Sequence, residues 1–422
     1  MTNSDSTGVL RRASRSRTFW MASTLMVGGL ALAGCASTTT ASSGTSSSGT
    51  TTASTVSTLD DAIITTSTGS EDATTTQETI ADTTAAVEAF LATLSDEQVE
   101  AVTYDYDDET KTTSWSNFPV TFVERAGLNL AELTDEQQEA AMAVLEALLS
   151  DEAYETVVSV MGGDQYLLEN SSTTETSLGQ YYIAFFGDAS DTDAYAVQFG
   201  GHHLGINADL NGSENAITFA PTHLGVQPAV YTNEDGEEVQ PFDAIYTDAF
   251  AFYDSLTEEQ QATLTSGDVT FCAPGDTCEY ESGAGLSGAD LTDEQRELLL
   301  ELIANWAGMA DEETTATELA EIEATLDETV IAWSGETTYD MSTGDGINFS
   351  ISGPNVYLAF QAQGGSAGAD VEGVSTSGWG HVHTIYRDPS NDYANSVEQQ
   401  AAAGGMGGAP ADGEMPSGAP AE

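Results

Sequence analysis

Four copies of a short helix-starting pattern set the framework of this chain. Each copy has a leucine, then serine or threonine, two acidic residues and a glutamine. The copies end at Gln98, Gln137, Gln260 and Gln295. The pattern is a capping box, in which the hydroxyl and the glutamine side chain satisfy free N–H groups and the acids favour the positive end of the helix dipole. It predicts helices near 96–103, 135–149, 258–265 and 293–307. The irregular spacing indicates reused cap chemistry and not a solenoid repeat.

Further helices and several strands are predicted between these starts. Helical periodicity favours helices near 78–93, 152–168, 243–255 and 313–325. Extended patterns occur at 181–186, 195–199, 204–210, 217–219, 330–333, 347–351, 356–360 and 382–386. Helices and hairpins in separate runs indicate an α+β fold. We expect a mainly antiparallel sheet with flanking capped helices, in a single large domain.

The N-terminal segment has the pattern of an exported lipoprotein. Four arginines precede an apolar run over 18–33, and the run ends in Leu-Ala-Gly followed by Cys35. The run is short and wrongly flanked for a dedicated membrane span. We therefore predict a lipoprotein signal peptide over 1–35, lipidation of Cys35 and an extracytoplasmic, membrane-anchored protein. A short N-terminal membrane anchor is the alternative.

Composition divides the rest of the chain into three parts. Residues 36–77 are rich in serine and threonine and predict a disordered tether. Residues 399–422 are rich in glycine, alanine and proline and predict a disordered tail. Residues 78–398 are long enough for the α+β domain, and they hold all five histidines.

Two cysteines remain besides Cys35. Cys272 and Cys278 flank a Pro-Gly-Asp turn. An even pair of cysteines in an exported protein predicts a disulfide that closes a small loop. A pair of metal-binding thiols is the alternative, and it is less favoured because no histidine lies near them in the sequence.

The chain has an extreme excess of acid. It holds 69 Asp and Glu against 8 Lys and Arg, which gives a formal net charge of −61. Nucleic acid is excluded as a partner, because almost nothing is present to neutralise phosphates. The acids are spread along the chain and do not form a calcium-loop pattern. In molar salt the Debye length is about 3 Å, so self-repulsion is screened. The composition therefore indicates the surface of a halophile's protein.

This interpretation predicts that the domain loosens or unfolds when salt is removed. Unscreened repulsion among the acids opposes the compact state. Circular dichroism, recorded from molar salt down to none, measures the effect. Unchanged stability across the titration would contradict the halophilic interpretation.

The five histidines fall in two short clusters. His202, His203 and His223 form the first, and His381 and His383 form the second. Residues two apart on a strand point to the same face, so the His-x-His pair presents two imidazoles to one metal at about 2.0–2.1 Å. Nitrogen ligands suit zinc, copper, nickel or iron. The clusters predict a transition-metal site, and hydrogen-bonded core histidines are the alternative.

The residues around the first cluster predict a bulge. Bulky apolar residues occupy odd positions up to Phe199 and even positions from Leu204 onward. Since side chains alternate between faces, this switch indicates an extra residue in the strand at Gly200–Gly201. Neighbouring strand residues cannot both reach one metal, so we favour His202 over His203 as a ligand unless the bulge turns both inward.

A hairpin would complete the first cluster. If Leu210 pairs with Asn215, His202 lies opposite His223. We therefore expect a mononuclear centre of His202, His381 and His383, with His203 or His223 as further ligands.

Two residues after the second cluster are candidates for catalysis. Arg387 lies four residues after His383, so on a strand both side chains point to the same face. Arg387 could hold a substrate carboxylate or orient a ligand. Asp388 and Asp392 are the nearest carboxylates in the sequence. The alternative for Arg387 is a buried ion pair with one of the many acids.

Several blocks resemble the domain of unknown function 3500 family. They are Arg125 to Leu128, Phe199 to Leu204 with Asn207, Pro221 and Gly225 to Ala229, and His381 to Asp388 with Asp392 and Tyr393. The resemblance covers nearly the whole folded region and implies the domain extent and the positions of both histidine blocks. It implies no reaction. His223 lies outside the family pattern, and Ala394 stands where the pattern has glycine.

These observations predict an exported, lipid-anchored protein with a histidine-rich zinc, copper or iron site. A metal-dependent hydrolase or oxidoreductase acting on a small molecule is the first hypothesis. A non-catalytic metal- or ligand-binding surface lipoprotein is the second, and a structural surface protein with packed histidines is the third.

Overall fold

The computed structural model describes residues 73–264 and 284–399. Within these ranges the chain forms eight α-helices and a twelve-stranded sheet, which confirms the α+β fold. None of the described helices has the length and apolar character needed to cross a membrane. Cys35, Cys272 and Cys278 lie outside the described residues, so the lipidation and the disulfide stay predictions.

All eight predicted helices are present. Each of the four capping boxes forms as predicted, with the hydroxyl accepting from the glutamine N–H and the glutamine side chain accepting from the cap N–H. The boxes start α3 (Asp96–Val102), α4 (Asp135–Leu148), α7 (Glu258–Gln261) and α8 (Asp293–Ala307). The other helices are α2 (Thr76–Thr93), α5 (Asp151–Asn170), α6 (Asp243–Ser255) and α9 (Glu312–Glu323).

The large sheet has the order β1-β3-β4-β5-β7-β14-β13-β12-β11-β10, with β2 paired to β3 and β6 paired to β5. Its first strands are β1 (Thr103–Tyr104), β2 (Leu128–Asn129), β3 (Tyr182–Phe186), β4 (Ala194–Gly200), β5 (Leu204–Asn211), β6 (Ala216–Thr218) and β7 (Thr222–Val226). The others are β10 (Leu286–Ser287), β11 (Val330–Gly335), β12 (Ile347–Ser352), β13 (Tyr357–Ala362) and β14 (Val382–Arg387). A separate pair joins β8 (Tyr231–Thr232) to β9 (Glu238–Val239). Among the described pairings only β1 with β3 is parallel, which confirms a mainly antiparallel sheet.

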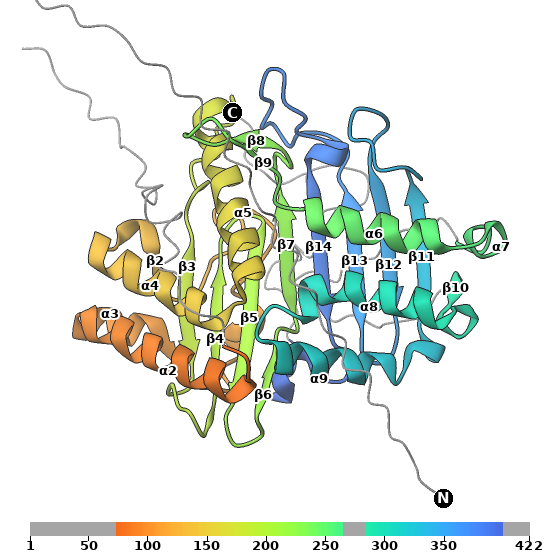
Figure 1. Ribbon diagram of the computed structural model, residues 1–422. Helices are drawn as coiled ribbons and strands as arrows, with labels where there is room; N and C mark the ends of the chain where they lie inside the picture. The colour runs from red at the N-terminus through yellow and green to blue at the C-terminus, as the bar shows by residue number, and fades with distance from the viewer. Residues whose placement is uncertain (1–72, 265–283, 400–422) are drawn as a thin grey trace, which may run out of the picture. The chain divides into compact units, whose positions relative to one another are not determined.

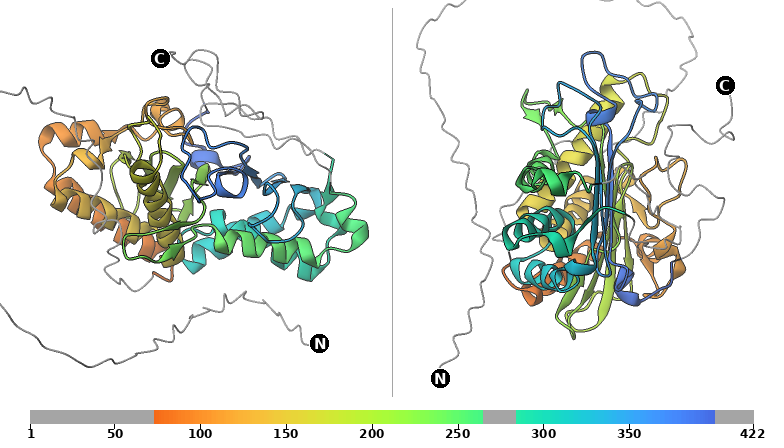
Figure 2. Two further views of the ribbon diagram at one scale, coloured as in Figure 1. Left: turned by 90° about the horizontal axis from the view of Figure 1, so that it is seen from above. Right: turned by 90° about the vertical axis from the view of Figure 1, so that its right-hand side faces the viewer.

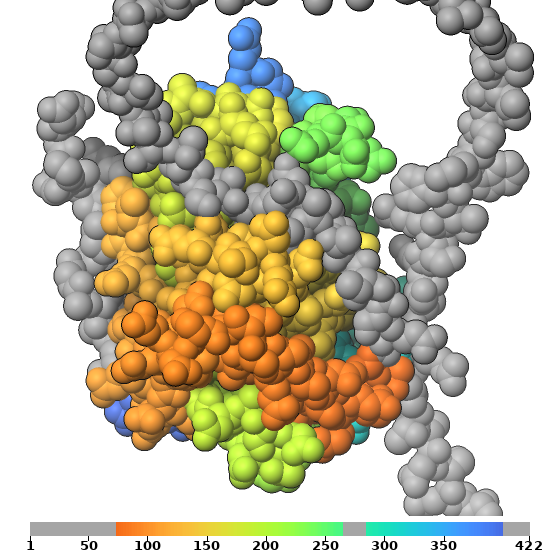
Figure 3. Space-filling model, turned by 90° about the vertical axis from the view of Figure 1, so that its left-hand side faces the viewer, coloured from red at the N-terminus to blue at the C-terminus, as the bar shows by residue number. Residues whose placement is uncertain are grey.

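The helices lie on one face of the sheet. Figure 1 shows α6, α8 and α9 in front of the strands β11 to β14, and α2, α4 and α5 in front of β3 to β7. Viewed from the side on which α2 and α4 lie, these helices form a broad layer on the surface (Figure 3). A single large apolar cluster joins the helices to the sheet. Because this core positions the strands rigidly, side chains at the strand ends are held in fixed places.

Two segments, one before β2 and one after β14, cover part of the opposite face. The segment before β2 lies on the side of the sheet away from the helices (Figure 2). Trp115 of this segment donates an indole N–H to the Tyr393 hydroxyl at 3.2 Å, and both pack with Ile385 of β14 in a second apolar cluster. Lys111 and Asp209 form an ion pair at 3.0 Å under the same cover, each with a side chain that is 1% exposed.

The domain is built from two similar halves. Residues 126–137 read AGLNLAELTDEQ and residues 284–295 read AGLSGADLTDEQ, and both segments form a short strand, a 3₁₀ turn and a capped helix. β2 pairs with β3 in the first half as β10 pairs with β11 in the second. The strand order therefore matches in the two halves: β3, β4, β5 and β7 of the first correspond to β11, β12, β13 and β14 of the second. The two halves meet where β7 pairs with β14.

The capping boxes follow this duplication. Gln137 donates its amide to the Gln98 side chain at 3.3 Å, and Gln295 donates to the Gln260 side chain at 3.0 Å. The four boxes are thus two equivalent pairs, one in each half. The spacing in the sequence is irregular because the stretch between the pairs, from Gln137 to Gln260, is longer than the stretch within either pair.

Candidate metal centre

The histidines gather at one end of the central strands. β7 and β14 pair antiparallel, with His383 opposite Gly225 and His223 opposite Ile385. The turn between β4 and β5 brings His202 and His203 to the same end, where the backbone N–H of Gly225 donates to the His203 carbonyl at 2.6 Å. The two remote histidine blocks therefore meet, as the sequence predicted.

A two-residue hairpin turn follows the glycine pair, in place of the predicted bulge. Gly200 pairs with Gly205, and the Gly201 N–H donates to the Leu204 carbonyl at 2.9 Å. His202 and His203 are the two residues of the turn. The change of parity arises because the chain reverses direction there. Odd-numbered residues of β4 pair with even-numbered residues of β5, so the apolar residues of both strands face the same core.

The equivalent turn of the second half shows that a hairpin here does not need histidines. Between β12 and β13, the Gly353 N–H donates to the Val356 carbonyl at 2.8 Å, and the turn residues are Pro354 and Asn355. His203 has a φ of 62°, whereas the matching Asn355 does not have a positive φ. A left-handed residue other than glycine costs about 1–3 kcal/mol, and such strain is concentrated at functional sites.

Three imidazole nitrogens converge at the turn. The Nε2 atom of His381 lies 3.2 Å from Nε2 of His203 and 3.1 Å from Nε2 of His383. In a tetrahedral zinc site, two ligand nitrogens lie about 3.3–3.4 Å apart. A neutral ring nitrogen carries either one proton or one lone pair. A hydrogen bond can therefore satisfy only one of the two contacts that Nε2 of His381 makes. A single metal ion would satisfy all three nitrogens at once.

Neighbouring groups prepare these rings for a metal. His381 donates its Nδ1–H to the Gly365 carbonyl at 3.2 Å, which leaves the lone pair on Nε2. Burial lowers the pKa of His381 to about 4 and holds the pKa of His203 and His383 well below the usual range. The three rings are therefore neutral at pH 7, which is the form that binds metals.

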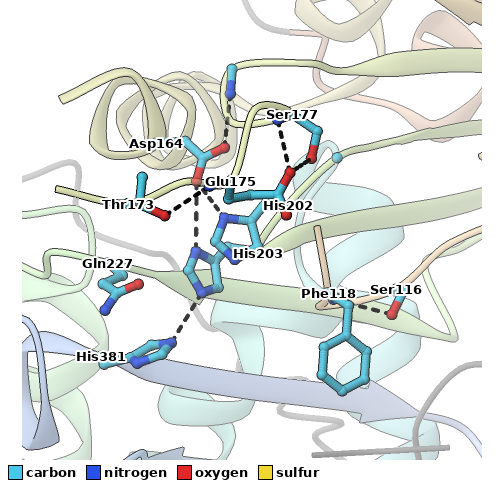
Figure 4. A network of polar contacts seen from close by, with 12 residues as sticks. Ser116, Phe118, Asp164, Thr173, Glu175, Ser177, His202, His203, Gln227 and His381 are labelled. Carbon is cyan, nitrogen blue, oxygen red and sulfur yellow. Dashed lines mark hydrogen bonds and ion pairs between the residues drawn. The ribbon is translucent and has the colours of Figure 1, made fainter. Parts of the chain in front are cut away.

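An aspartate that the sequence analysis did not single out completes the site. Asp164 of α5 is 1% exposed, and its Oδ1 atom lies 2.6 Å from His202 Nδ1 and 3.8 Å from His203 Nδ1 (Figure 4). Its other oxygen accepts the Gly179 N–H at 3.0 Å. Asp164 follows Val157, Val160 and Met161 on the buried stripe of α5, so an acid on an apolar face was the available signal.

The other two histidines have different positions. His202 contacts Asp164, and its ring lies against that of His203 with centroids 3.6 Å apart and planes tilted by 34°, but it is outside the group of three converging nitrogens. His223 is fully buried beside His383, with ring centroids 5.7 Å apart, and belongs to neither group that could hold a metal among the described residues. The geometry thus selects His203, where the sequence favoured His202.

The predicted register of the first cluster was wrong. Leu210 pairs with Ile217, and His223 lies opposite Gly205. The loop between β5 and β6 begins one residue later than predicted, and residues 219–221 interrupt the strand before β7. His202 therefore reaches the site through the turn and not through a cross-strand pair.

A buried arginine holds the turn from the opposite face. The Nη2 group of Arg125 donates to the Gly201 carbonyl at 2.7 Å and to the Ser116 carbonyl at 2.9 Å. Burial lowers the pKa of Arg125 to about 9, so it remains charged at pH 7. Arg125 thereby fixes the peptide that precedes His202.

The predicted catalytic pair does not join the histidines. Arg387 lies four residues beyond His383 on β14, which is about 14 Å at the usual rise per residue. It donates to Asp392 at 2.8 Å and to the Gln399 side chain at 2.6 Å, as expected for a buried ion pair. The Asp388 carboxylate accepts from the backbone and hydroxyl of Ser390. A catalytic role for Arg387 and Asp388 at the histidines has no support in this geometry.

Asp388 belongs instead to a group of acids that affects stability. Burial, with Asp388 and Glu321 nearby, raises the pKa of Glu318 on α9 to about 8. Burial also raises the pKa of Asp388 to about 6. Between pH 4.5 and 8 the folded state holds more protons than the unfolded state, so stability falls as pH rises across this window.

We expect Glu318→Gln to stabilise the protein above pH 8. One unit of pKa shift corresponds to about 1.4 kcal/mol, and partial exposure screens much of it, so the gain is on the order of 2 kcal/mol. Denaturant unfolding at pH 8.5 and pH 4.5 measures it, with a gain expected only at the higher pH. Glu323→Gln, an exposed acid on the same helix, is the control. Equal effects of both variants would show that general charge reduction is responsible.

The fold and site together define an α+β protein with a buried, histidine-rich group that could hold a metal ion. A family described as "Protein of unknown function (DUF3500)" matches residues 76–395, and the chain belongs to this family. This confirms the resemblance seen in the sequence. No curated protein and no solved structure matches the chain.

Proposed function

We propose that this protein binds a transition-metal ion through His203, His381 and His383. The convergence of the three Nε2 atoms carries the proposal. His203 comes from the first half of the domain and His381 and His383 come from the second, yet their nitrogens meet at one point. Zinc, copper and iron all accept three imidazole ligands. The strained turn at His203 and the tautomer fixed at His381 support it, since neither is needed for the hairpin itself.

Elemental analysis tests the proposal directly. Protein purified in molar salt, stripped with a chelator and reloaded with zinc, copper or iron should retain metal after gel filtration. His383→Gln should lower the retained amount strongly. No retained metal with any of these ions, in protein that keeps its folded circular-dichroism spectrum, would overturn it.

Burial favours a non-catalytic binding or structural role for these three ligands. The exposed fractions of His203, His381 and His383 are 1%, 2% and 5%. Closed sites of this kind are typical of structural metals, whereas a catalytic metal keeps an open position. The second candidate, a metal-dependent hydrolase or oxidoreductase, is favoured by the donor set: three protein ligands leave a fourth position for water or substrate.

We further propose that the metal-binding domain acts outside the cytoplasm as a lipid-anchored protein. The arginines, the apolar run and Cys35 support this address. Mass spectrometry of the mature N-terminus tests it. Diacylated Cys35 as the first residue is expected, and an unprocessed N-terminus would contradict it.

A further inference from the structure

A second set of donors lies directly beside the three converging histidines. Asp164, His202 and His203 each offer a ligand atom, and these atoms lie within 4.8 Å of one another. All three residues are buried. Two imidazoles and one carboxylate are a donor set found in zinc enzymes.

His203 belongs to both sets through different atoms. Its Nε2 faces His381 at 3.2 Å, and its Nδ1 faces Asp164 at 3.8 Å. Figure 4 shows the ring of His203 between these two partners. The distance of 3.8 Å exceeds a hydrogen bond, but it suits two ligands about 2.1 Å from one ion at a wide angle.

We propose that the site holds two metal ions bridged by the imidazole of His203. The first ion takes His203, His381 and His383, and the second takes Asp164, His202 and His203. This proposal rests on the metal binding proposed above and extends it to a dinuclear centre.

The two positions differ in access to solvent. The side chain of His202 is 10% exposed, whereas those of His203 and Asp164 are 2% and 1% exposed. The second ion would therefore lie nearer the surface and could keep a position for water or substrate. The first ion, enclosed by two strands and the turn, would fix the geometry of the bridge.

The proton balance of the second site is simple. The 2.6 Å contact between His202 and Asp164 is a short hydrogen bond with a proton on it. The entering cation displaces that proton and the Nδ1 proton of His203, and both leave to solvent. His203 then binds one ion through each nitrogen, with no oxidant or reductant required.

Metal stoichiometry tests the bridge. Chelator-stripped protein in molar salt is saturated with Zn²⁺, passed through gel filtration and analysed for zinc per chain. We expect two ions in the wild type, one in Asp164→Asn and one in His202→Gln. The second variant keeps the test valid if the first fails to fold. Asp340→Asn, an exposed acid far along the sequence, controls for loose binding to carboxylates and should retain two.

Copper gives an independent readout of the shared ring. Two Cu²⁺ ions bridged by one imidazolate couple their spins antiferromagnetically, so the wild-type electron paramagnetic resonance signal at liquid-helium temperature should fall below half of that expected for the copper bound. His202→Gln should show the full signal of one isolated ion.

The possible results separate the two proposals. One zinc ion in the wild type and one in Asp164→Asn would overturn the bridge and leave the mononuclear centre standing. Loss of all zinc in Asp164→Asn would also overturn it, because Asp164 would then be a positioning residue for His203. No zinc in the wild type would overturn both proposals.

Discussion

Replacing His381 with glutamine is expected to remove most of the metal-dependent stabilisation of this protein. An ion that binds only the folded state stabilises it by about 4 kcal/mol when its free concentration is a thousand times the dissociation constant. His381 is the middle member of the group, with Nε2 at 3.2 Å and 3.1 Å from its two partners. Changing a group that only supports a ligand weakens binding about 10- to 100-fold, so losing this ligand should cost more.

The measurement is denaturant unfolding in molar salt, with a chelator or with saturating zinc. The wild type should gain stability with zinc, and His381→Gln should gain much less, because only the group of Asp164, His202 and His203 stays complete. His223→Gln is the matched comparison, because His223 is a buried neighbour outside the converging group. We expect it to lower stability in both conditions and to keep the zinc response. Loss of that response in His223→Gln alone would show that His223 is the ligand.

Breaking the buried ion pair between Lys111 and Asp209 is expected to destabilise the protein by about 3–5 kcal/mol. The two side chains are each 1% exposed and 3.0 Å apart. Lys111 also donates to the Ser396 hydroxyl at 2.9 Å and lies 4.1 Å from the ring centre of Tyr106. Lys111→Met leaves a buried carboxylate without its cation, and that uncompensated charge is the source of the cost.

Denaturant unfolding of single and double variants separates the parts of this effect. Lys111→Met with Asp209→Leu should recover most of the loss, because an apolar pair of similar volume often replaces a buried ion pair at little cost. Asp327→Asn breaks the Arg296–Asp327 pair, in which Asp327 is 70% exposed, and should cost at most about 1 kcal/mol. A similar small loss for Lys111→Met would show that the buried pair contributes little.

The internal duplication explains why one histidine centre is expected for the whole domain and not one centre in each half. Both halves build the same hairpin, but only the first half has histidines in the turn, and the second half has Pro354 and Asn355. His223 on β7 and His383 on β14 lie on the neighbouring central strands where the halves meet. Each half thus supplies part of one shared centre: the turn comes from the first, and the His-x-His pair comes from the second.

Local patterns were sufficient to predict the helices. A capping box satisfies its own N–H groups within four residues, so Thr134 and Gln137 start α4 whatever else surrounds them. The His-x-His strand was predicted for the same reason, because alternation fixes the faces of His381 and His383 without reference to other strands.

Tertiary contacts decided the features that the sequence analysis missed. β7 was not separated from β6, since Pro221 and Gly225 weaken its strand pattern and pairing with β14 supplies its order. The change of parity at Gly200–Gly201 fits a bulge and a hairpin equally well in the sequence. Only the register of Gly200 with Gly205 distinguishes them.

The sequence by itself determined the helix starts, the α+β class and the two histidine blocks, because those depend on residues close together in the chain. The tertiary structure alone decided which nitrogens converge. Asp164, His203 and His381 are remote in sequence, and their meeting depends on the pairing of β7 with β14 and the packing of α5 over the first half. Ligand geometry requires positions accurate to a fraction of an ångström, and only the packed core of the whole domain fixes side chains that closely.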